Sequence, residues 1–564
     1  MTAFHLGVST SGHDPALAIV DDNGAVRFAE ATERFVQDKR AWGIAPDHVP
    51  HLESALAQVG FDAARDTLAV GTSWAGVKAE LGKAPQDALL PARDTLWMQG
   101  LQGQLHATAG RSLLRLGLAD APPDPMRFDH HLCHAVAAAW FAPVDDAVCI
   151  VLDGEGEVGA LSVFDMRARR LTRRFRSWGP GSLGTFYGWL TGLCGFDWRK
   201  GEEWKVMGLA AFGQVIPELA EVMRGMVAVD RGRLRFADPE TLRRATDRCQ
   251  PHVRRPADPV EAAADLAATG QAVYAALADQ VIADCLDGDE RLPLILSGGC
   301  ALNSSHNGTI RDRFALPALH VPPCPADDGN AIGAALLAYM RTKGCDAVPR
   351  GDGSPYLGST VAIRMLDKLR VSARGLAVRD MGDGSARAVA DCLVQGRIVG
   401  VMRGRAEFGP RALGNRSILA APQVSGMKDR LNAEVKGREA YRPFAPVVRL
   451  ADTSAWFECA QPSPYMSVTL PWHASRRDMV PATVHADGTG RLQTVKRDTA
   501  SWMVDLLDAC EDLCGIPVVL NTSFNIMGKP IVHSVEDAVA MLMTSGLDAI
   551  LVEDMLVEKP GAAA

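Results

Sequence analysis

Residues 5–31 read HLGVSTSGHDPALAIVDDNGAVRFAEA. Two apolar runs, His5–Val8 and Ala16–Val20, are followed by the letters DNG at residues 22–24 and by a third run, Val26–Ala31. Asn-Gly between two β-type runs favours a tight hairpin, because both residues tolerate the left-handed backbone that such a turn needs. The stretch therefore predicts three short strands in succession.

Further along the chain, apolar runs end in glycine-rich turns. Ala147–Leu152 leads into Asp153-Gly154, and Leu292–Leu296 leads into Ser297-Gly298-Gly299. The small-residue run Asn330–Tyr339 predicts a helix that packs closely on a sheet. This pattern is typical of an α/β fold with its chemistry at strand ends. A three-strand start is compatible with the actin/Hsp70/sugar-kinase type of fold, although composition alone does not select it.

The length of 564 residues predicts two to four domains. Residues 342–356 (TKGCDAVPRGDGSPY) are rich in turn-forming residues and lack periodicity. We therefore expect an N-terminal domain at 1–345, a linker at 346–360 and a second domain at 361–564. In the second domain, Ala386–Gln395 predicts a helix and Arg397–Met402 a strand.

Composition excludes several classes of protein. The net charge is −8, with both signs spread along the chain and no basic stripe, so nucleic acid is not the expected partner. No apolar run approaches ~18 residues, and the N-terminus does not resemble a signal peptide. The 12 cysteines are scattered, as in reduced intracellular proteins. We expect a cytoplasmic protein without a membrane span.

A candidate metal site begins at residues 130–134 (HHLCH). His130 and His134 are four residues apart, so on a helix both imidazoles face one side and can reach one ion. Asp153 ends a predicted strand, and Asp327-Asp328 precede a predicted helix. Two His with carboxylates suit Fe(II), Mn or Zn. From spacing alone, a helical His pair without an ion is equally compatible.

A candidate nucleotide site lies at Gly298 and Gly299, whose backbone N–H groups could approach a phosphate or ribose. Lys205, within EWKVMG at residues 203–208, could bind a phosphate, and its alternative is a solvated ion pair. A glycine pair after a strand is more often simply a tight turn.

The second domain carries clustered cations. Segments 407–417 (EFGPRALGNRS), 436–446 (KGREAYRPFAP), 487–491 (DGTGR) and 521–525 (NTSFN) combine Arg or Lys with turn residues. Arg matches phosphate and carboxylate geometry, and Lys supplies a point charge. The segments favour two anionic substrates in one site, such as a nucleoside triphosphate and an acyl phosphate. No Walker A pattern is present.

These phrases resemble O-carbamoyltransferases of the NodU/CmcH/TobZ type over nearly the whole chain. The N-terminal half is similar to TsaD, with an actin/Hsp70-like (ASKHA) fold, through HHLCHA, KVMGLA, GGCALN and DDGNAIGAA. The C-terminal half is similar to a YrdC-like α/β domain through GPRALGNRSI and LNTSFN. Lys529, in GKPIV, stands where the family usually has Glu, and residues 9–13 also depart from the common form.

The resemblance implies a role for each matching residue. It implies that the family's metal, Fe(II) by preference, is bound by His130, His134, Asp153 and Asp327, with Asp328 open as the alternative to Asp327. It implies that carbamoyl phosphate and ATP, with Mg²⁺, are bound by Arg411, Lys436, Arg442, Arg491, Asn521 and Ser523. The adenylate in the N-terminal domain falls to Gly298, Gly299 and Asn303, with Lys205 beside them.

The expected activity is ATP-dependent carbamoyl transfer through carbamoyl-adenylate to a hydroxyl of a small molecule, for example in antibiotic or other secondary-metabolite biosynthesis. We expect His13 as the general base, with Lys436 and Arg411 acting in adenylation. A homodimer is also expected from the family. An ASKHA small-molecule kinase, a tRNA-modifying threonylcarbamoyl enzyme and a non-catalytic nucleotide-binding regulator stay open as alternatives.

Overall fold

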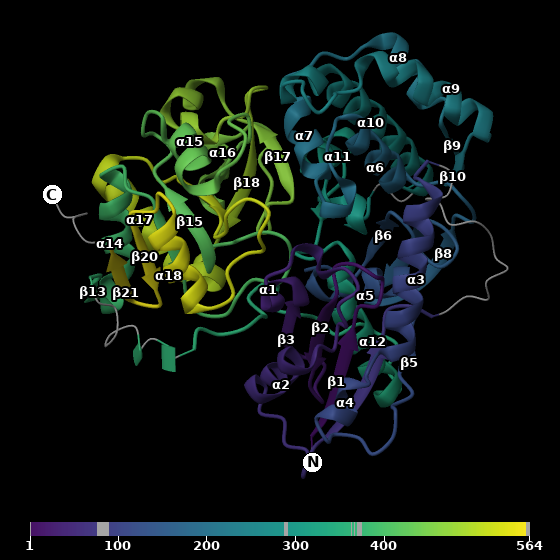
Figure 1. Ribbon diagram of the computed structural model, residues 1–564, viewed down its shortest axis with the longest axis horizontal. Helices are drawn as coiled ribbons and strands as arrows, with labels where there is room; N and C mark the ends of the chain where they lie inside the picture. Colours follow the sequence, from purple (N-terminus) through teal and green to yellow (C-terminus); the bar gives the residue numbers. More distant parts are fainter. Residues whose placement is uncertain are drawn as a thin grey trace. The chain divides into compact units, whose positions relative to one another are not determined.

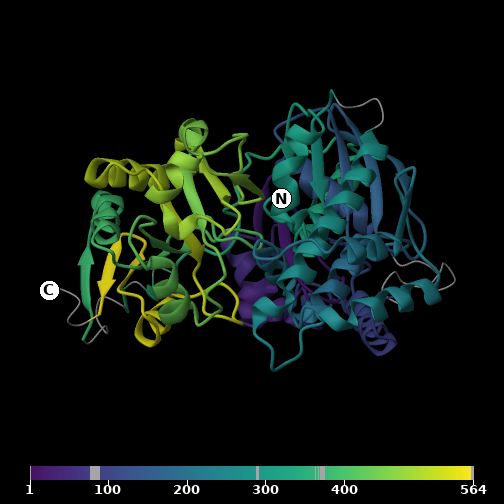
Figure 2. The same cartoon turned by 90° about the horizontal axis from the view of Figure 1, so that it is seen from above.

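The computed structural model describes residues 2–75, 89–286, 291–362, 364–365, 367–368 and 375–559. The chain divides into two units. Residues 1–33 and 40–353 form the first unit, and residues 34–39 and 354–564 form the second. Figures 1 and 2 colour the first unit purple to teal and the residues after 353 green to yellow.

The first unit contains two five-stranded sheets built on one plan. Their orders are β3-β2-β1-β4-β5 and β8-β7-β6-β11-β12. In each, the first three strands are antiparallel, and the last two continue parallel to the central one. The strands are β1 (Ala3–Val8), β2 (Ala16–Val20), β3 (Val26–Ala31), β4 (Thr67–Thr72), β5 (Met126–Arg127), β6 (Ala147–Leu152), β7 (Leu161–Arg167), β8 (Arg170–Arg176), β11 (Leu294–Ser297) and β12 (Leu319–His320). This duplicated plan confirms the predicted actin/Hsp70-like α/β class.

Helices and one small hairpin complete the first unit. The hairpin is β9 (Val227–Asp230) with β10 (Arg233–Phe236). The helices are α1 (Thr32–Val36), which crosses into the second unit, α2 (Val49–Gln58), α3 (Ala92–Thr108), α4 (Ser112–Arg115), α5 (His130–Phe141), α6 (Leu183–Leu193), α7 (Glu203–Ala210), α8 (Pro217–Arg224), α9 (Pro239–Cys249), α10 (Ala264–Leu286), α11 (Ser304–Arg313) and α12 (Asn330–Lys343).

Helix α12 packs against both β1 and α5 (Figure 1). Two glycines make this close approach possible. A Cβ added at Gly7 would lie 2.0 Å from the carbonyl oxygen of Ala331, and one added at Gly333 would lie 2.0 Å from that of Cys133. The small residues predicted at 330–339 therefore fix α12 and α5 side by side, and both helices lead away from the candidate metal residues.

The second unit is built on one mixed sheet of nine strands, in the order β13-β21-β20-β14-β15-β19-β16-β18-β17. The strands are β13 (Ala377–Asp380), β14 (Val399–Met402), β15 (Arg416–Ala420), β16 (Ala445–Arg449), β17 (Val468–Pro471), β18 (Thr489–Val495), β19 (Val519–Ser523), β20 (Ala549–Val552) and β21 (Met555–Glu558). The helices are α14 (Ser385–Val394), α15 (Met427–Arg430), α16 (Thr453–Trp456), α17 (Arg497–Cys514) and α18 (Val535–Thr544). Residues of α14 and α17 join one apolar cluster on the sheet, and residues of α15 and α18 join another.

The boundary between the units falls between Gly353 and Ser354, inside the segment where we placed the linker. Backbone hydrogen bonds hold both sides of it, from Gly351 to Trp140 and from Phe408 to Pro355. Residues 34–39, which lie within the predicted first domain, group with the second unit. The Arg34 guanidinium donates to the carbonyls of Glu407 and Gly409, at 2.5 and 2.6 Å.

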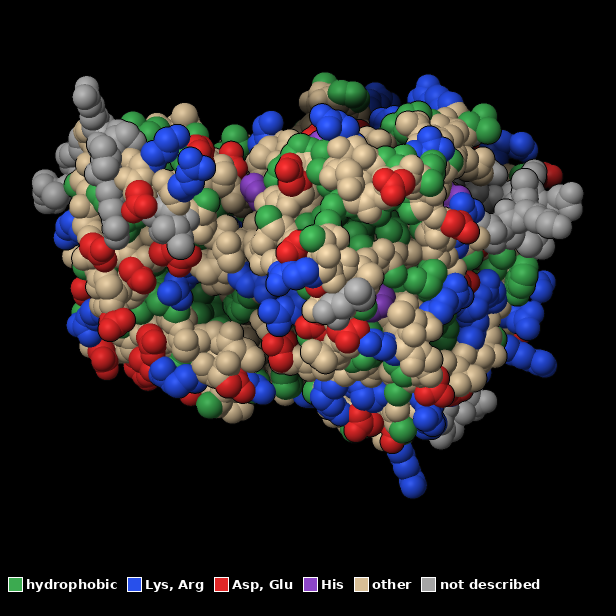
Figure 3. Space-filling view, turned by 90° about the horizontal axis from the view of Figure 1, so that it is seen from below, with side chains coloured by type: hydrophobic (Ala, Val, Ile, Leu, Met, Phe, Trp, Pro, Cys, Tyr) green, Lys and Arg blue, Asp and Glu red, His purple; other side chains and the backbone are tan. Residues whose placement is uncertain are grey.

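Two further observations concern the chain as a whole. No helix among the described residues is long and apolar enough to cross a membrane. All 12 cysteines are free thiols. On the face drawn in Figure 3, basic and acidic side chains are interspersed.

Candidate functional site

Helix α5 brings His130 and His134 to one place. Asp129 caps the helix, since its Oδ1 accepts the backbone N–H of Leu132 at 2.9 Å. The helix therefore begins at His130, and His134 follows one turn later on the same face. Both imidazoles are 1% exposed. The predicted spacing thus produces a buried His pair.

Two carboxylates approach this pair from other elements. Asp153 follows the fully buried strand β6, and its Oδ1 accepts the N–H of Gly299 at 2.7 Å. Asp327 begins the short turn, residues 327–329, that leads into α12. Asp328 lies outside the cluster, with its Oδ1 accepting the N–H of Gly329. The turn therefore distinguishes two adjacent Asp residues that the sequence left open.

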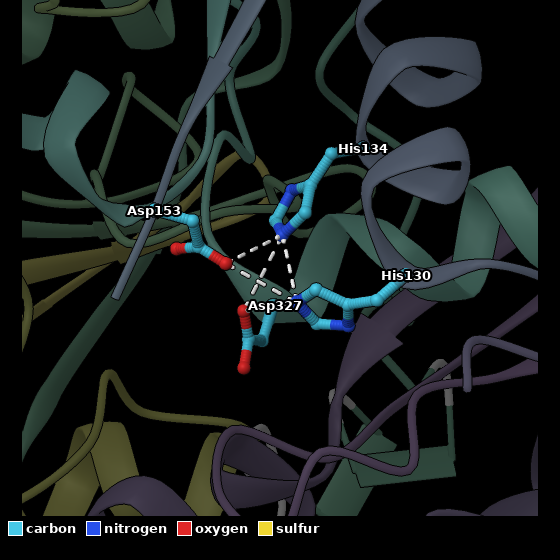
Figure 4. Close-up of side chains that lie close together, drawn as sticks. All are labelled: His130, His134, Asp153 and Asp327. Carbon is cyan, nitrogen blue, oxygen red and sulfur yellow. Dashed lines mark hydrogen bonds and ion pairs between the residues drawn. The ribbon is translucent and has the colours of Figure 1, made fainter. Parts of the chain in front are cut away.

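The four side chains have the geometry of a metal site (Figure 4). The two Nε2 atoms lie 3.3 Å apart, and each lies 3.2–3.5 Å from Asp153 Oδ2 and Asp327 Oδ1. Ligand atoms ~2.1 Å from one ion at tetrahedral angles lie ~3.4 Å from one another. The donor set of two imidazoles and two carboxylates suits a divalent transition metal.

A buried amide beside the cluster also fits a metal. Asn330 Nδ2 lies 3.2 Å from Nδ1 of His130, while Asn330 Oδ1 is buried without a partner. An ion on Nε2 of His130 would leave the imidazole proton on Nδ1. If the Asn330 amide is turned so that its Oδ1 and Nδ2 exchange places, Oδ1 accepts the Nδ1–H of His130. Both groups then have a partner.

The electrostatics of the cluster are those of a site that binds positive charge. Burial alone would raise the pKa of Asp327, but the neighbouring imidazoles hold it well below its usual range. Burial alone would lower the pKa of His130, yet Asp327 and Asp153 raise it well above 6.5. His131 differs, because burial lowers its pKa to about 3 and its Nδ1 lies against Ser162.

His13 lies next to the cluster. Its Nδ1 is 3.6 Å from Asp327 Oδ2, which is the oxygen that faces away from the two imidazoles, and 2.9 Å from Asp14 Oδ2. Arg40 donates to Asp14 at 2.7 Å and lies 2.9 Å from the same His13 nitrogen. The candidate base is thus held by charged neighbours beside a candidate metal ligand.

The predicted nucleotide residues have structural partners. Gly298 has φ +89°, and a Cβ there would lie 2.3 Å from the carbonyl of Leu152, so the turn requires glycine. The N–H of Gly299 donates to Asp153, which gives this turn a role in the metal cluster that the sequence did not indicate. Asn303 caps α11, and buried Lys205 pairs with Glu202 at 2.9 Å. Their binding of a nucleotide stays a prediction.

The second unit gathers five cations around one place, namely Arg411, Lys436, Arg438, Arg442 and Arg491. Burial and the charge of Arg491 hold the pKa of Arg411 well below its usual range. Burial, Arg438 and Arg442 do the same for Lys436, and burial lowers the pKa of Arg491 to about 10. Among the described residues, neither Arg411 nor Arg491 has a side-chain hydrogen bond or an ion pair. Such mutually repelling cations are typical of an anion site.

A buried carboxylate shapes the loop that presents Arg411. Glu407 Oε1 accepts the backbone N–H groups of Leu413, Asn415 and Arg416 at 2.7–3.2 Å. Arg416 is fully buried and donates to four backbone carbonyls. Arg416 is therefore part of the loop's framework, whereas the side chain of Arg411, in the same phrase, has no hydrogen-bond partner among the described residues.

Of the remaining predicted residues, Ser523 contacts Lys436, whereas Asn521 has other partners. Its Nζ donates to the carbonyls of Ser523 and Asn525, both at 2.7 Å, and to Asn525 Oδ1 at 2.6 Å. Asn521 is buried and donates to Ala412 and Gln493, with its Oδ1 unpartnered. Sequence reasoning missed Arg438, although it lies in the quoted segment 436–446, and it missed Glu407, whose place three residues before Pro410 gave no signal.

The chain belongs to the carbamoyltransferase family. Residues 5–336 match the family model "Carbamoyltransferase N-terminus", and residues 390–559 match "Carbamoyltransferase C-terminus". The predicted family and enzyme class are thereby confirmed.

Three curated relatives illustrate the match. Nodulation protein NolNO of Sinorhizobium fredii (strain NBRC 101917 / NGR234) is 34% identical over 457 residues, which cover 78% of this chain and 65% of that protein, just under two thirds of its length. The 3'-hydroxymethylcephem-O-carbamoyltransferase of Amycolatopsis lactamdurans is 33% identical over 75% of this chain and 79% of its own length. Nodulation protein U of the same S. fredii strain is 29% identical over 98% of each chain.

Proposed function

We propose that this carbamoyltransferase forms carbamoyl-adenylate from carbamoyl phosphate and ATP in its second unit. We further propose that it transfers the carbamoyl group to a small-molecule hydroxyl in its first unit. The observation that carries this division is the self-repelling cation cluster around Arg411 and Arg491. Half-buried cations without counter-ions are stabilised when anionic ligands bind, and both proposed substrates are polyanions.

In the proposed first reaction, water converts carbamoyl phosphate to carbamate and phosphate. A carbamate oxygen then attacks the α-phosphorus of ATP, the bond to pyrophosphate breaks, and carbamoyl-adenylate forms. Arg411, Lys436, Arg442 and Arg491 would neutralise the charge that develops on the phosphoryl oxygens. Mg²⁺ would accompany ATP.

In the proposed second reaction, the acceptor oxygen attacks the carbamoyl carbon, the bond to AMP breaks, and AMP leaves. His13 would take the hydroxyl proton, and Asp14 would hold its imidazole in place. A divalent ion, Fe(II) by preference, held by His130, His134, Asp153 and Asp327, would supply Lewis acidity there. The 3'-hydroxymethylcephem relative supports an acceptor drawn from secondary metabolism.

The test has two parts, both without an acceptor: ATP and carbamoyl phosphate are incubated with the enzyme and labelled pyrophosphate to follow exchange, and labelled ATP replaces unlabelled ATP to trap the adenylate. We expect exchange of labelled pyrophosphate into ATP that depends on carbamoyl phosphate, together with trapped carbamoyl-adenylate. Release of ADP without pyrophosphate exchange would indicate a kinase and overturn the proposal.

A further inference from the structure

A row of aromatic side chains leads from His13 to the surface of the first unit. The ring of Trp42 meets the imidazole of His13 edge to face, with centroids 4.9 Å apart. The ring of Trp97, on α3, lies 4.9 Å from Trp42 at an interplanar angle of 39°. The two steps place Trp97 within about 10 Å of the candidate base.

Trp97 is exposed although it is packed on Trp42. Its exposed fraction is 44%, and the ring of Trp42 lies against it. An exposed aromatic ring that is held near a candidate catalytic group is a suitable surface for stacking a ring of a ligand. The pair Trp42 and Trp97 is called the aromatic platform below.

The platform is held in place by polar contacts on both sides. Trp42 Nε1 donates to the carbonyl of Arg199 at 2.7 Å, and the Arg40 guanidinium lies 5.2 Å from the Trp42 ring centroid. An ion pair of 3.7 Å between Arg199 and Asp94 joins this loop to α3. The platform is therefore formed before any ligand arrives, which keeps the entropic cost of binding low.

A carboxyl group lies within electrostatic range of His13. The charges of Arg40, Asp14 and His13 act on Glu203, whose pKa burial raises. Among the described residues, no other side chain forms a hydrogen bond or an ion pair with Glu203.

We propose that Trp42 and Trp97 determine acceptor specificity by stacking a ring of the acceptor. The reactive hydroxyl of the acceptor lies on that ring or on a ring next to it. This inference rests on the proposed function and deepens it, since it assigns the acceptor a shape. The ring packs its flat face on Trp97, and its hydroxyl reaches His13. An open-chain alcohol lacks the flat face and gains little from the platform.

The test uses the full-length, metal-loaded enzyme and matched probe alcohols. The ring probes are cyclohexylmethanol, benzyl alcohol and a methyl glucopyranoside, and the open-chain probes are heptan-1-ol and sorbitol. Each enzyme preparation is first checked by pyrophosphate exchange, and binding of each probe is then measured by saturation-transfer NMR titration. We expect ring probes to bind at least 10-fold more tightly than open-chain probes of similar size.

Three variants locate the preference. In Trp97→Ala, affinity for ring probes should fall about 10-fold, within the 5- to 150-fold range that one stacked ring supports. In Trp97→Phe, most of the affinity for ring probes should return, because phenylalanine restores a flat ring. Leu96→Ala, which truncates an exposed neighbour on the same helix, is the matched control and should bind as the wild type does.

Equal binding of ring and open-chain probes by the wild type would overturn the inference, and so would unchanged ring binding in Trp97→Ala. An equal loss in Leu96→Ala would do the same, because it would indicate a general disturbance of α3. Absence of pyrophosphate exchange in the wild type would instead count against the proposed adenylation. The two failures are therefore distinguishable.

Discussion

His131 and His134 are both buried on α5, yet only one of them faces the carboxylates. His134 Nε2 lies 3.4 Å from both Asp153 and Asp327, whereas His131 Nδ1 lies 2.9 Å from Ser162 Oγ. We expect His134→Ala to lose most of the bound metal, because one of four ligands is removed. Metal analysis of the purified protein measures this.

His131→Asn is the matched control for that substitution. It changes a buried imidazole on the same helix without touching the ligand set, so the metal content should stay near that of the wild type. Retention of metal in His134→Ala, or equal loss in both variants, would contradict the assignment of the cluster.

Arg411 and Arg416 lie in one phrase but should respond oppositely to truncation. Arg411 has no partner among the described residues and is repelled by Arg491, so Arg411→Ala should leave the melting temperature unchanged or raised. Its pyrophosphate exchange should fall about 10²–10³-fold, as when one preorganised donor is removed. Arg416→Ala should destabilise the protein by about 3 kcal/mol or more, since four backbone carbonyls, that of buried Ser359 among them, lose the donor of a fully buried side chain. Thermal melts and exchange assays on both variants would reveal a reversed order.

The contact between α5 and α12 fixes the cluster at the level of elements. Gly333→Ala would press a methyl group onto the carbonyl of Cys133 and force the helices apart. We expect a loss of about 2 kcal/mol or more in unfolding free energy, and weaker metal binding because Asp327 precedes α12. Gly192→Ala is the control, since no atom lies within 4 Å of its added Cβ on α6, and it should be neutral or stabilising by up to about 1 kcal/mol. Chemical denaturation and metal titration would compare the two, and equal effects would refute the argument.

Several elements were predictable because most of their residues are apolar and buried. Ala16–Val20, Val26–Ala31 and Ala147–Leu152 are strands with the predicted bounds. The duplication of the sheet plan was not visible, because strand pairing depends on topology that unlike sequences can share. The choice between Asp327 and Asp328 was likewise open, since adjacent identical residues differ only in where the turn points them.

At the scale of the whole chain, residues 34–39 group with the second unit, whereas the predicted division places them in the first domain. Nothing in the composition of this short segment separates it from its neighbours, and its assignment to the second unit depends on contacts with residues more than 370 positions away. Long-range contacts of this kind leave no local pattern. Charge clusters, by contrast, were readable because cations, Gly and Pro recur together in segments 407–417 and 436–446.

The two polar centres lie in different units, so their contributions to the reaction should separate. Lys436→Met keeps the volume of a buried side chain and removes the charge that Ser523 and Asn525 hold, so it should abolish carbamoyl-phosphate-dependent pyrophosphate exchange. His130→Ala should spare the exchange and block carbamoyl transfer, because the metal cluster is confined to the first unit. Lys496→Ala, an exposed lysine of the second unit, is the control and should leave both reactions intact. Pyrophosphate exchange and acceptor-dependent AMP release are measured on the same preparations. Loss of exchange in both Lys436→Met and His130→Ala would mean that the two centres do not act separately.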